Sequence, residues 1–456
     1  MPSRHRIVLL LAAVLALHSA DTATVDSAAQ QIREGLALTR TDLGLVVTVS
    51  GLVGALAAVP FGILADRVVR VRLLAIAVML WGAGAVFTGW AWSLPSLLAA
   101  RALLGVVLAA SGPVVASLIG DWFPSARRGR IYSRVLTGEL VGTGIGFVAT
   151  GNVATLLSWR WSFWLLAAPA VPLAVLLWRL PEPSRGGQPD SAEQADAHQG
   201  AVVQRAVARA RIEPDADLAR AQVQAGRSLL AAARVILQVR TNLALIVGSA
   251  LGYSFLSAVQ TFGVGFATER FHLSHAVVTS LLPVLGIGVV AGVLLGGRYG
   301  DHLVRQGHVS GQVRVGVIAF AGSAVVYAPA FFLTSAWLAA PFLVVASGLL
   351  GSANPPVDAA RLDVLHPSLW GRGEAVRSVL RGLGESFAPL AFGLLTERVF
   401  GGGVSGTADA FVVLLLAMLA AAGVLVAAMR SYPRDVATAT EARRLSRPQA
   451  RPASQR

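Results

Sequence analysis

The chain has 456 residues, of which 55% are hydrophobic and only 14% are charged. Soluble globular proteins carry about 25% charged residues, so this composition excludes an ordinary soluble domain. There is no cysteine, which excludes disulfides and thiolate chemistry, and all 38 basic residues are arginine.

Apolar runs of roughly 20 residues, the length that a helix needs to cross a bilayer core, recur along the chain. We therefore predict an all-α integral membrane protein with twelve transmembrane helices in two pseudo-symmetric six-helix bundles. The first run is interpreted as a retained span and not as a signal peptide. The predicted spans are 7–30, 42–64, 73–93, 96–119, 131–153, 161–179, 241–266, 276–299, 313–333, 338–361, 376–399 and 409–429.

A polar stretch separates the first six spans from the last six. It begins at Pro181-Glu-Pro-Ser-Arg-Gly-Gly, a composition typical of a helix stop. We interpret it as a solvated tether that is partly helical near 228–239; a surface helix on anionic lipid is the alternative. The predicted domains are an N-terminal bundle (1–180), a cytoplasmic linker (181–238), a C-terminal bundle (239–430) and a cytoplasmic tail (431–456).

Arginine gathers in alternate connections between the spans, in the linker and in both tails. The positive-inside rule then places both termini in the cytoplasm, with the chain in the plasma (inner) membrane of a prokaryote. The net charge of +14 thus indicates how the spans are oriented in the membrane. We expect the lipid bilayer, and not nucleic acid, to be the partner of these arginines.

The two halves repeat a short motif. Gly62 and Asp66 are followed by Arg70, and Gly297 and Asp301 by Arg305, and neighbours are four positions apart in both copies. A Gly-Glu pair also occurs once in each half, at Gly138-Glu139 in the fifth span and at Gly384-Glu385 in the eleventh. Parallel repeats joined by a central loop are an architecture of secondary transporters, in which the substrate path runs between the halves.

These motifs resemble those of the major facilitator superfamily over essentially the whole chain. The main one is Gly62-x-Leu64-x-Asp66-Arg67-x-x-Arg70-x-Arg72, supported by Arg101 and Gly105 in span four and Trp159-Arg160-Trp161 before span six. Val68 replaces the usual glycine, and span five lacks the proline of the drug-antiporter motif. Asp21, Arg101 and Leu180-Pro-Glu-Pro-Ser-Arg-Gly186 are also similar to the Spinster-like branch.

Charges inside the spans are the main candidates for function, because they are costly in a bilayer. Arg101 lies roughly 8 Å and Asp21 about 13 Å from the outer ends of their spans by helix rise, so they are compatible partners. His18 shares a helix face with Asp21. We predict that His18, Asp21 and Arg101 couple protons to transport, with a fixed structural ion pair as the alternative. Asp26 is expected to be solvated near the outer mouth.

Glu139 and Glu385 are further candidate proton carriers, since each follows a glycine that lets a neighbouring helix approach. The alternative is a glutamate bonded to a nearby arginine, such as Arg381 for Glu385. Span seven carries an aromatic face that is either substrate-facing or, more typically, packed core; its residues are Tyr253, Phe255, Phe262 and Phe266.

Two glycine stripes with one-turn spacing predict close helix packing. If spans five and eight meet across the halves, the stripes form a seam that can rock; packing within each half is the alternative. The stripes are Gly138, Gly142 and Gly146 in span five, and Gly288, Gly292 and Gly296 in span eight.

The first basic loop is predicted to act as a conformational latch. Asp66 is placed to accept bonds at the N-terminus of a helix of the other half, where the helix dipole favours an anion. Gly62, Arg67 and Arg70 belong to the same latch, and Asp301 to its weaker second copy.

No phosphate-binding loop, G-x-S-x-G elbow or metal-ligand cluster occurs, so we expect no enzyme activity, no metal and no cofactor. Polar side chains are sparse in the spans, which favours a small amphipathic organic substrate. We predict a monomeric, proton-coupled transporter that works by alternating access, with efflux favoured. The alternatives are proton-coupled uptake of a metabolite, lipid transport, and a membrane sensor or scaffold without transport.

Overall fold

The computed structural model describes residues 4–108, 111–122, 135, 137–139, 141–183, 212–225 and 229–446, and these residues form helices joined by short connections, with no strand. Helices satisfy every backbone hydrogen bond within one segment, which a spanning chain in lipid requires. The side chains of Gly62, Asp66 and Arg67 lie outside what the structure describes.

The N-terminal half contains the first six predicted spans. Its helices are α1 (Arg4–Ser27), α2 (Ala29–Gly35), α3 (Arg40–Arg67), α4 (Arg70–Gly89), α5 (Leu94–Leu108), α6 (Ser111–Trp122), the π-helical turn η1 (Ile145–Thr150), α8 (Gly151–Leu156), α9 (Trp159–Ala167) and α10 (Ala170–Trp178). Span six is divided into α9 and α10 by a turn at Ala168-Pro169, whereas residues 109–110, between α5 and α6 of span four, lie outside the described ones.

The C-terminal half contains the other six, together with two helices from the predicted linker. They are α12 (Ala216–Gln224), α13 (Leu229–Gln238), α14 (Arg240–Phe271), α15 (His275–Arg305), α16 (Gly311–Phe332), α17 (Ala336–Ser352), α18 (Asn354–Asp363), the 3-10 turn η3 (Pro367–Leu369), α19 (Trp370–Leu394), the π-helical turn η4 (Leu395–Val399) and α20 (Gly403–Leu445).

The all-helical membrane fold is confirmed. Among the described residues, nine helices are long and apolar enough to cross a bilayer, and Leu94–Val107 is a shorter apolar helix. The predicted spans missing from those nine are the fourth and fifth, which are only partly described, and the eleventh, whose helix carries several arginines. The twelve predicted spans are therefore consistent with the structure.

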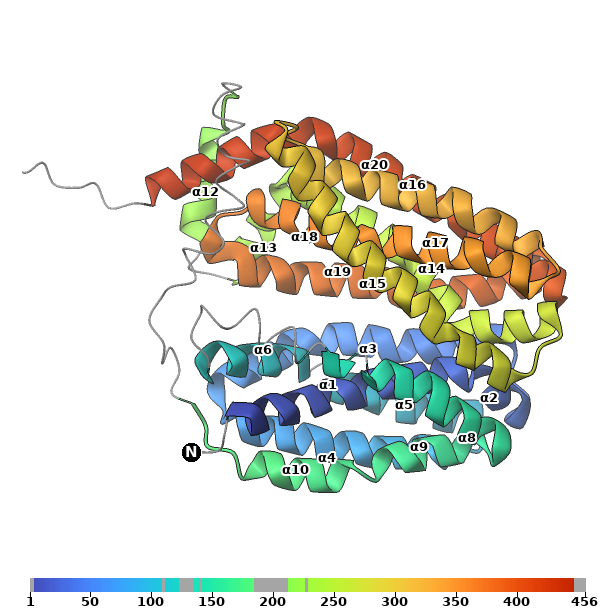
Figure 1. Cartoon of the computed structure of the whole chain (residues 1–456). Coiled ribbons are helices and arrows are strands. Elements are labelled where there is room, and N and C mark those ends of the chain that lie inside the picture. The colour runs from blue at the N-terminus through green and yellow to red at the C-terminus, as the bar shows by residue number, and fades with distance from the viewer. Residues whose placement is uncertain are drawn as a thin grey trace, which may run out of the picture.

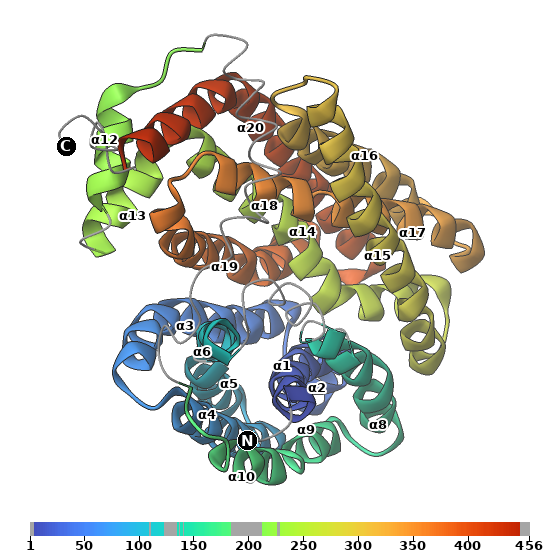
Figure 2. The same ribbon diagram turned by 60° about the vertical axis from the view of Figure 1, so that its left-hand side comes forward.

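Two bundles lie side by side, blue to green for the N-terminal half and yellow to red for the C-terminal half (Figure 1). Helices α2 and α8 lie at one end, and α12 and α13 at the other, as the turned view also shows (Figure 2). The arginine distribution predicts that the end with α2 and α8 faces outside. We call it the outer end and the opposite one the cytoplasmic end.

Local signals explain where several helices begin and end. Thr39 caps α3 in a reciprocal capping box with Asp42. The α14 helix ends at His272, which adopts a left-handed conformation with φ of 54°. Between η4 and α20, Gly401, Gly402 and Gly403 all have positive φ, which only glycine adopts without strain.

The glycine stripes pack within each half and not between the halves. A methyl group at Gly142 would overlap the carbonyl oxygen of Ala16 in α1, and one at Gly292 would overlap that of Gly348 in α17. The other four glycines face the same two helices; they are Gly138, Gly146, Gly288 and Gly296. The predicted rocking seam is therefore wrong for these stripes, because each closes a helix pair inside its own bundle.

Equivalent helix contacts support the internal repeat. Gly54 of span two faces Gly105 of span four, as Gly288 of span eight faces Val344 of span ten. Span five packs on span one, and Gly384 of span eleven packs on Ala250 of span seven. Corresponding spans thus have corresponding neighbours in the two halves, as two parallel repeats require.

The described part of the linker, residues 212–225 and 229–238, is folded against the cytoplasmic end of the C-terminal half. The backbone amide of Asp215 donates to Thr438 Oγ1 (2.9 Å), and Gln222 is fully buried. The α20 helix also continues to Leu445, and Tyr432 and Val436 of its extension are buried. The interpretation as a solvated tether is wrong for these residues, because α12 buries its apolar face on α20.

We expect Gly142→Val to destabilise the protein by about 1–3 kcal/mol, because the added methyl groups force α1 and span five apart. Gly144→Val is the matched control, since nothing lies within 4 Å of a Cβ at that position. Thermal unfolding of the purified protein in detergent measures both. Equal melting temperatures for the two variants would contradict this packing.

Candidate functional site

A buried ion pair joins α1 to α5 inside the N-terminal half. Arg101 Nη1 lies 2.9 Å from Asp21 Oδ2 and 3.2 Å from Oδ1. Asp21 is fully buried and Arg101 is 4% exposed. The structure therefore brings together the two residues that their depths in the sequence predicted as partners.

Asp26 is a third charged group of this region, and sequence reasoning misplaced it. Its exposure is 5%, and Thr261 of α14 donates a hydrogen bond to its Oδ1 at 3.2 Å. The expectation of a solvated Asp26 is wrong, because α14 of the other half covers this face of α1. In the sequence, the burial of Asp26 was indicated only by its position about one and a half turns beyond Asp21 on the same long apolar helix.

Two buried carboxylates thus stand near a single guanidinium. Within the described residues Asp26 forms no ion pair, whereas Asp21 has Arg101. A buried carboxylate without a cation is costly in its ionised form, and taking up a proton removes that charge. This group of three side chains can therefore hold a proton. The Asp26–Thr261 bond also links the state of the group to the contact between the halves.

His18 does not join the ion pair through a hydrogen bond. Its ring nitrogen Nδ1 is buried without a hydrogen-bonding group among the described residues, and it lines a small cavity with Trp81 and Ser111. The predicted cluster of three is therefore the Asp21–Arg101 pair, with His18 one turn away on the side of α1 that faces α4 and α6.

The two candidate glutamates differ from each other. Glu139 is exposed, and its backbone carbonyl accepts a hydrogen bond from Thr143 Oγ1 at 3.0 Å. Its predicted burial is wrong, because Gly138, not Glu139, faces α1. Glu385 is partly buried and accepts from Arg381 Nε at 2.6 Å, which is the arginine-bonded alternative.

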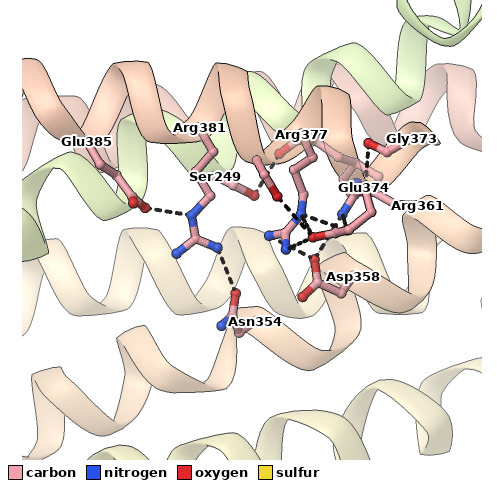
Figure 3. Close-up of polar contacts among 11 residues, drawn as sticks. Ser249, Asn354, Asp358, Arg361, Gly373, Glu374, Arg377, Arg381 and Glu385 are labelled. Atoms are coloured by element: carbon pink, nitrogen blue, oxygen red, sulfur yellow. Dashed lines mark hydrogen bonds and ion pairs between the residues drawn. The ribbon is translucent and has the colours of Figure 1, made fainter. Parts of the chain in front are cut away.

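Arg381 is the deepest arginine of α19, and its guanidinium lies between Glu385 and Asn354 (Figure 3). Besides Glu385, it donates to Asn354 Oδ1 at 3.4 Å. Its guanidinium carbon lies 4.1 Å from the centroid of the Tyr253 ring, which is a cation–π contact. The side chain is 20% exposed, so this cation is partly accessible halfway along α19.

A second set of charges lies on the cytoplasmic side of Arg381 (Figure 3). Arg361 lies 3.3 Å from Asp358 and 3.1 Å from Glu374, and Arg377 also pairs with both acids. These four side chains tie α18 to α19. The break between α17 and α18 that places them falls just before Asn354-Pro355-Pro356, because proline interrupts the hydrogen bonding of a continuous helix.

The aromatic face of span seven is packed core. Phe255 is fully buried, and Phe262 stacks on Phe392 with their ring centroids 4.7 Å apart. Tyr253 and Phe266 are also buried, against Phe320 and Phe411 respectively. Apart from the Tyr253 ring beneath Arg381, the structure gives these side chains packing partners.

The predicted latch can be followed only in part. Asp66, Arg67 and Gly62 lie outside the described side chains, so their latch role stays a prediction. Arg70 is buried and donates to Ser117 of the same half at 2.6 Å, and it pairs at 2.8 Å with Glu182, which directly follows the last span of that half. At Asp301 the backbone carbonyl accepts from Arg305 Nε at 3.3 Å.

The two halves meet at the outer end through an outer seam formed by Arg33, Arg40, Thr41, Glu269 and Glu397. Arg40 lies 3.0 Å from Glu269 across the halves, and Arg33 lies 3.8 Å from the same carboxylate. Glu397 accepts from the backbone amide of Arg40 and from Thr41 Oγ1 at 2.6 Å. Acids of the C-terminal half thus hold the N-terminus of α3.

Contacts between the halves continue inward along α3 and α19. Gly44 packs on Pro389, and Thr48 Oγ1 donates to the Ser386 carbonyl at 2.5 Å. Further in, a Cβ at Gly382 would lie 3.7 Å from Ala55. The described ion pairs nearer the cytoplasm all stay within one half. In the described residues the protein is therefore closed at its outer end.

Comparison with known proteins shows which family and which known folds this chain resembles. Residues 11–389 match the family model described as Major Facilitator Superfamily. The fold is similar to a bacterial homologue of the human lysosomal transporter Spinster in an inward-facing, unoccupied conformation, with a TM-score of 0.72, 19% identity, and 97% of this chain and 98% of that chain covered. It is also similar to the nucleoside transporter NupG, with a TM-score of 0.68 and 13% identity over 93% of this chain and 98% of that one.

Among curated relatives, the 4-hydroxybenzoate transporter PcaK of Pseudomonas aeruginosa is 30% identical over 40% of this chain and 41% of its own length. The 3-(3-hydroxy-phenyl)propionate transporter of Escherichia coli is 32% identical over 37% of this chain and 42% of its own length. The chain thus matches about two fifths of the length of these relatives.

We expect Arg101→Met to destabilise the protein by about 3–5 kcal/mol, because it leaves the Asp21 charge buried without its partner. Adding Asp21→Leu to Arg101→Met should recover most of this loss, because the double variant buries no charge. Thermal unfolding of the two variants measures the difference. A double variant no more stable than the single one would contradict a buried pair.

The outer seam predicts that Glu397→Gln opens the outer end. The chain has no cysteine, so a single Thr48→Cys reports access to the space between α3 and α19. Its labelling by an impermeant maleimide added outside cells should accelerate about tenfold when Glu397→Gln weakens the charge-assisted bonds to Arg40 and Thr41.

Asp409→Asn, at an exposed acid of the same end, is the matched control for this labelling experiment and should leave the rate unchanged. An unchanged rate in Glu397→Gln as well would refute the seam. Labelling only in inverted vesicles would instead show that the cytoplasmic and outer ends are reversed.

Proposed function

Because the chain belongs to the Major Facilitator Superfamily, a family of membrane transporters and not of enzymes, we propose that it is a secondary active transporter of a small organic anion. Transport occurs by alternating access of a path between the two halves, driven by a proton gradient. The protein is a multi-pass membrane protein, and we place it in the plasma membrane with both termini in the cytoplasm.

The Asp21–Arg101 ion pair is the observation that carries this proposal. When Asp21 is ionised, it neutralises Arg101. When Asp21 takes a proton, the guanidinium loses its counter-ion and attracts an anion instead. Proton and anion then bind together and not in competition, which is the thermodynamic condition for symport.

Because the proton and the anion bind together, this coupling favours uptake over efflux. An inward proton gradient drives a co-bound anion into the cell, whereas antiport requires a substrate that competes with the proton for Asp21. The efflux favoured by the sequence fits a cationic substrate, for which Asp26 offers a buried carboxylate, whereas Arg101 and Arg381 both favour an anion. We therefore prefer uptake, one of the alternatives left open above.

Two observations support an organic anion as the substrate. Arg381 is an accessible cation halfway along α19, stacked on Tyr253, so a carboxylate with an aromatic or apolar body fits both groups. The names of similar proteins include 4-hydroxybenzoate, D-galactonate and 3-(3-hydroxy-phenyl)propionate, all of which are carboxylates. We propose that the substrate carboxylate replaces Glu385 as the partner of Arg381.

Uptake of radiolabelled 4-hydroxybenzoate, followed by a panel of aromatic and sugar carboxylates, tests this in proteoliposomes with an imposed proton gradient. The wild-type protein should accumulate at least one of them when the outside is acidic. Asp21→Asn should abolish accumulation, because it cannot take up a proton, while Arg381→Gln should raise the KM about tenfold or more.

The outcomes separate the alternatives. Accumulation of a substrate inside liposomes with an acidic lumen, against the outward flow of protons, would establish antiport and overturn the charge argument. Transport of labelled phospholipid but of no carboxylate would favour a lipid carrier. A correctly folded protein that moves none of these substrates, with unchanged cellular function in Asp21→Asn and Arg101→Ala, would favour a sensor.

A further inference from the structure

A pocket lies within the outer seam, between α2 and the start of α3 on one side and α14 on the other. Its volume is about 30 Å³. A volume of this size holds about two water molecules, and so the two oxygens of a carboxylate but not the body of an organic acid. The lining combines two cations, two aromatic rings and neutral polar groups; these residues are Arg33, Arg40, Phe262, Phe266, Gln30 and Thr407.

The two arginines of this pocket share a single acid. Among the described lining residues Glu269 is the sole acid, and no other described acid pairs with Arg33 or Arg40. The Glu269 carboxylate lies 3.0 Å from Arg40 but 3.8 Å from Arg33, and the longer distance is too great for a hydrogen bond. The Arg33 side chain is also 26% exposed, so its N–H groups are available to a further anion.

Three other acids of the outer end bind elsewhere. Glu34 accepts from Gln30 Nε2 at 3.0 Å, and Asp42 belongs to the capping box at the start of α3. Glu397 accepts from the backbone amide of Arg40 and does not pair with its guanidinium. The two guanidiniums therefore face one carboxylate, and this local excess of positive charge attracts anions.

The cations of the pocket come from one half of the protein and the acid comes from the other. Arg33 and Arg40 belong to the N-terminal half, whereas Glu269 lies near the end of α14. When the halves part at the outer end, Glu269 moves away and leaves two guanidiniums facing external water. A carboxylate is an anion that guanidinium groups bind well, and the Phe262 and Phe266 rings on the opposite wall suit an apolar body.

We infer that Arg33 and Arg40 form an outer capture site for the carboxylate of the substrate, and that Glu269 displaces this carboxylate when the outer end closes. The inference rests on the proposed transport of an organic anion. A glutamate then occupies each arginine site when no substrate is bound there. Glu269 does so at the outer site, as Glu385 does at Arg381.

The site is tested first by the effect of an external anion on the outer seam. Benzoate is the probe, and benzamide, which has the same ring without the charge, is its control. Benzoate binds both arginines only after Glu269 has left them, so it shifts the protein toward the open outer end. In the Thr48→Cys protein, in de-energised right-side-out vesicles, benzoate should accelerate labelling by the impermeant maleimide about fivefold or more, whereas benzamide should not.

Substitutions of Arg33 show whether this pocket is responsible. Arg33→Gln should abolish the acceleration, and Arg33→Lys, which keeps the charge, should retain most of it. The longer contact of Arg33 with Glu269 means that these changes disturb the closed state less than changes of Arg40. Arg270→Gln is the matched control and should keep the acceleration, since Arg270 lies at the same end but donates to backbone carbonyls of its own half.

Arg381→Gln separates the outer site from the inner one and should also keep the acceleration. Acceleration that persists in Arg33→Gln, or that is lost in Arg381→Gln, would overturn the capture site. Equal labelling rates with benzoate and benzamide in the Thr48→Cys protein would overturn it as well.

Uptake kinetics then connect the capture site with transport. Arg33→Gln should raise the KM for the transported carboxylate about tenfold and leave kcat within about twofold, because it lowers the local concentration of the anion at the outer end. A lower kcat at unchanged KM would show that Arg33 only holds the seam, and would overturn capture. If the wild type transports no carboxylate, the proposed function fails, and the benzoate labelling still decides whether the outer site binds an anion.

Discussion

Charges within a bilayer are stable only with partners, and this constraint organises the N-terminal half around Asp21 and Arg101. The pair costs far less free energy while both groups are ionised and together than when one group is left alone. Any event that neutralises Asp21 therefore changes what Arg101 attracts. Asp26 adds a second carboxylate to the same region, hydrogen-bonded to Thr261 of the opposite half. In the proposed function, proton binding at Asp21 and the contact between the halves therefore depend on the same group of charges.

The halves repeat the same helix contacts but differ in the charged side chains that they hold inside the membrane. The N-terminal half holds buried acids beside one arginine, whereas the C-terminal half presents Arg381 over Tyr253 in a more accessible position. Glu385 keeps Arg381 neutralised when no other anion is bound. In the proposed function, protons are handled by the first half and the anion by the second. Coupling then requires contacts that cross the halves, and α3 against α19 supplies them.

The fold and the ion pair could be predicted from the sequence, because span length, arginine placement and the depth of a charge within its span can be read directly along the chain. It was insufficient wherever the answer depended on which helix covers a face. Asp26 lies near the end of its span, but α14 buries it. Glu139 lies inside a span, but Gly138 takes the packed face and leaves Glu139 exposed. The outer seam was missed because its charges lie near helix ends in both halves, and only tertiary packing brings them together.

The linker and the C-terminal extension of α20 explain how the halves can move as units. Gln222 is buried against the loop that follows α18, accepting from the His366 amide at 2.7 Å and donating to the Val364 carbonyl. Tyr432 of α20 donates to Asp363 at 2.8 Å in the same place. The Arg70–Glu182 pair fastens the cytoplasmic end of the other half in a similar way. Each half is thus fastened internally at the cytoplasmic end, while the described polar contacts between the halves lie toward the outer end. A motion that exchanges access must then break the outer seam and leave these internal fastenings intact, which is a rotation of two rigid bundles and not a rearrangement within either of them.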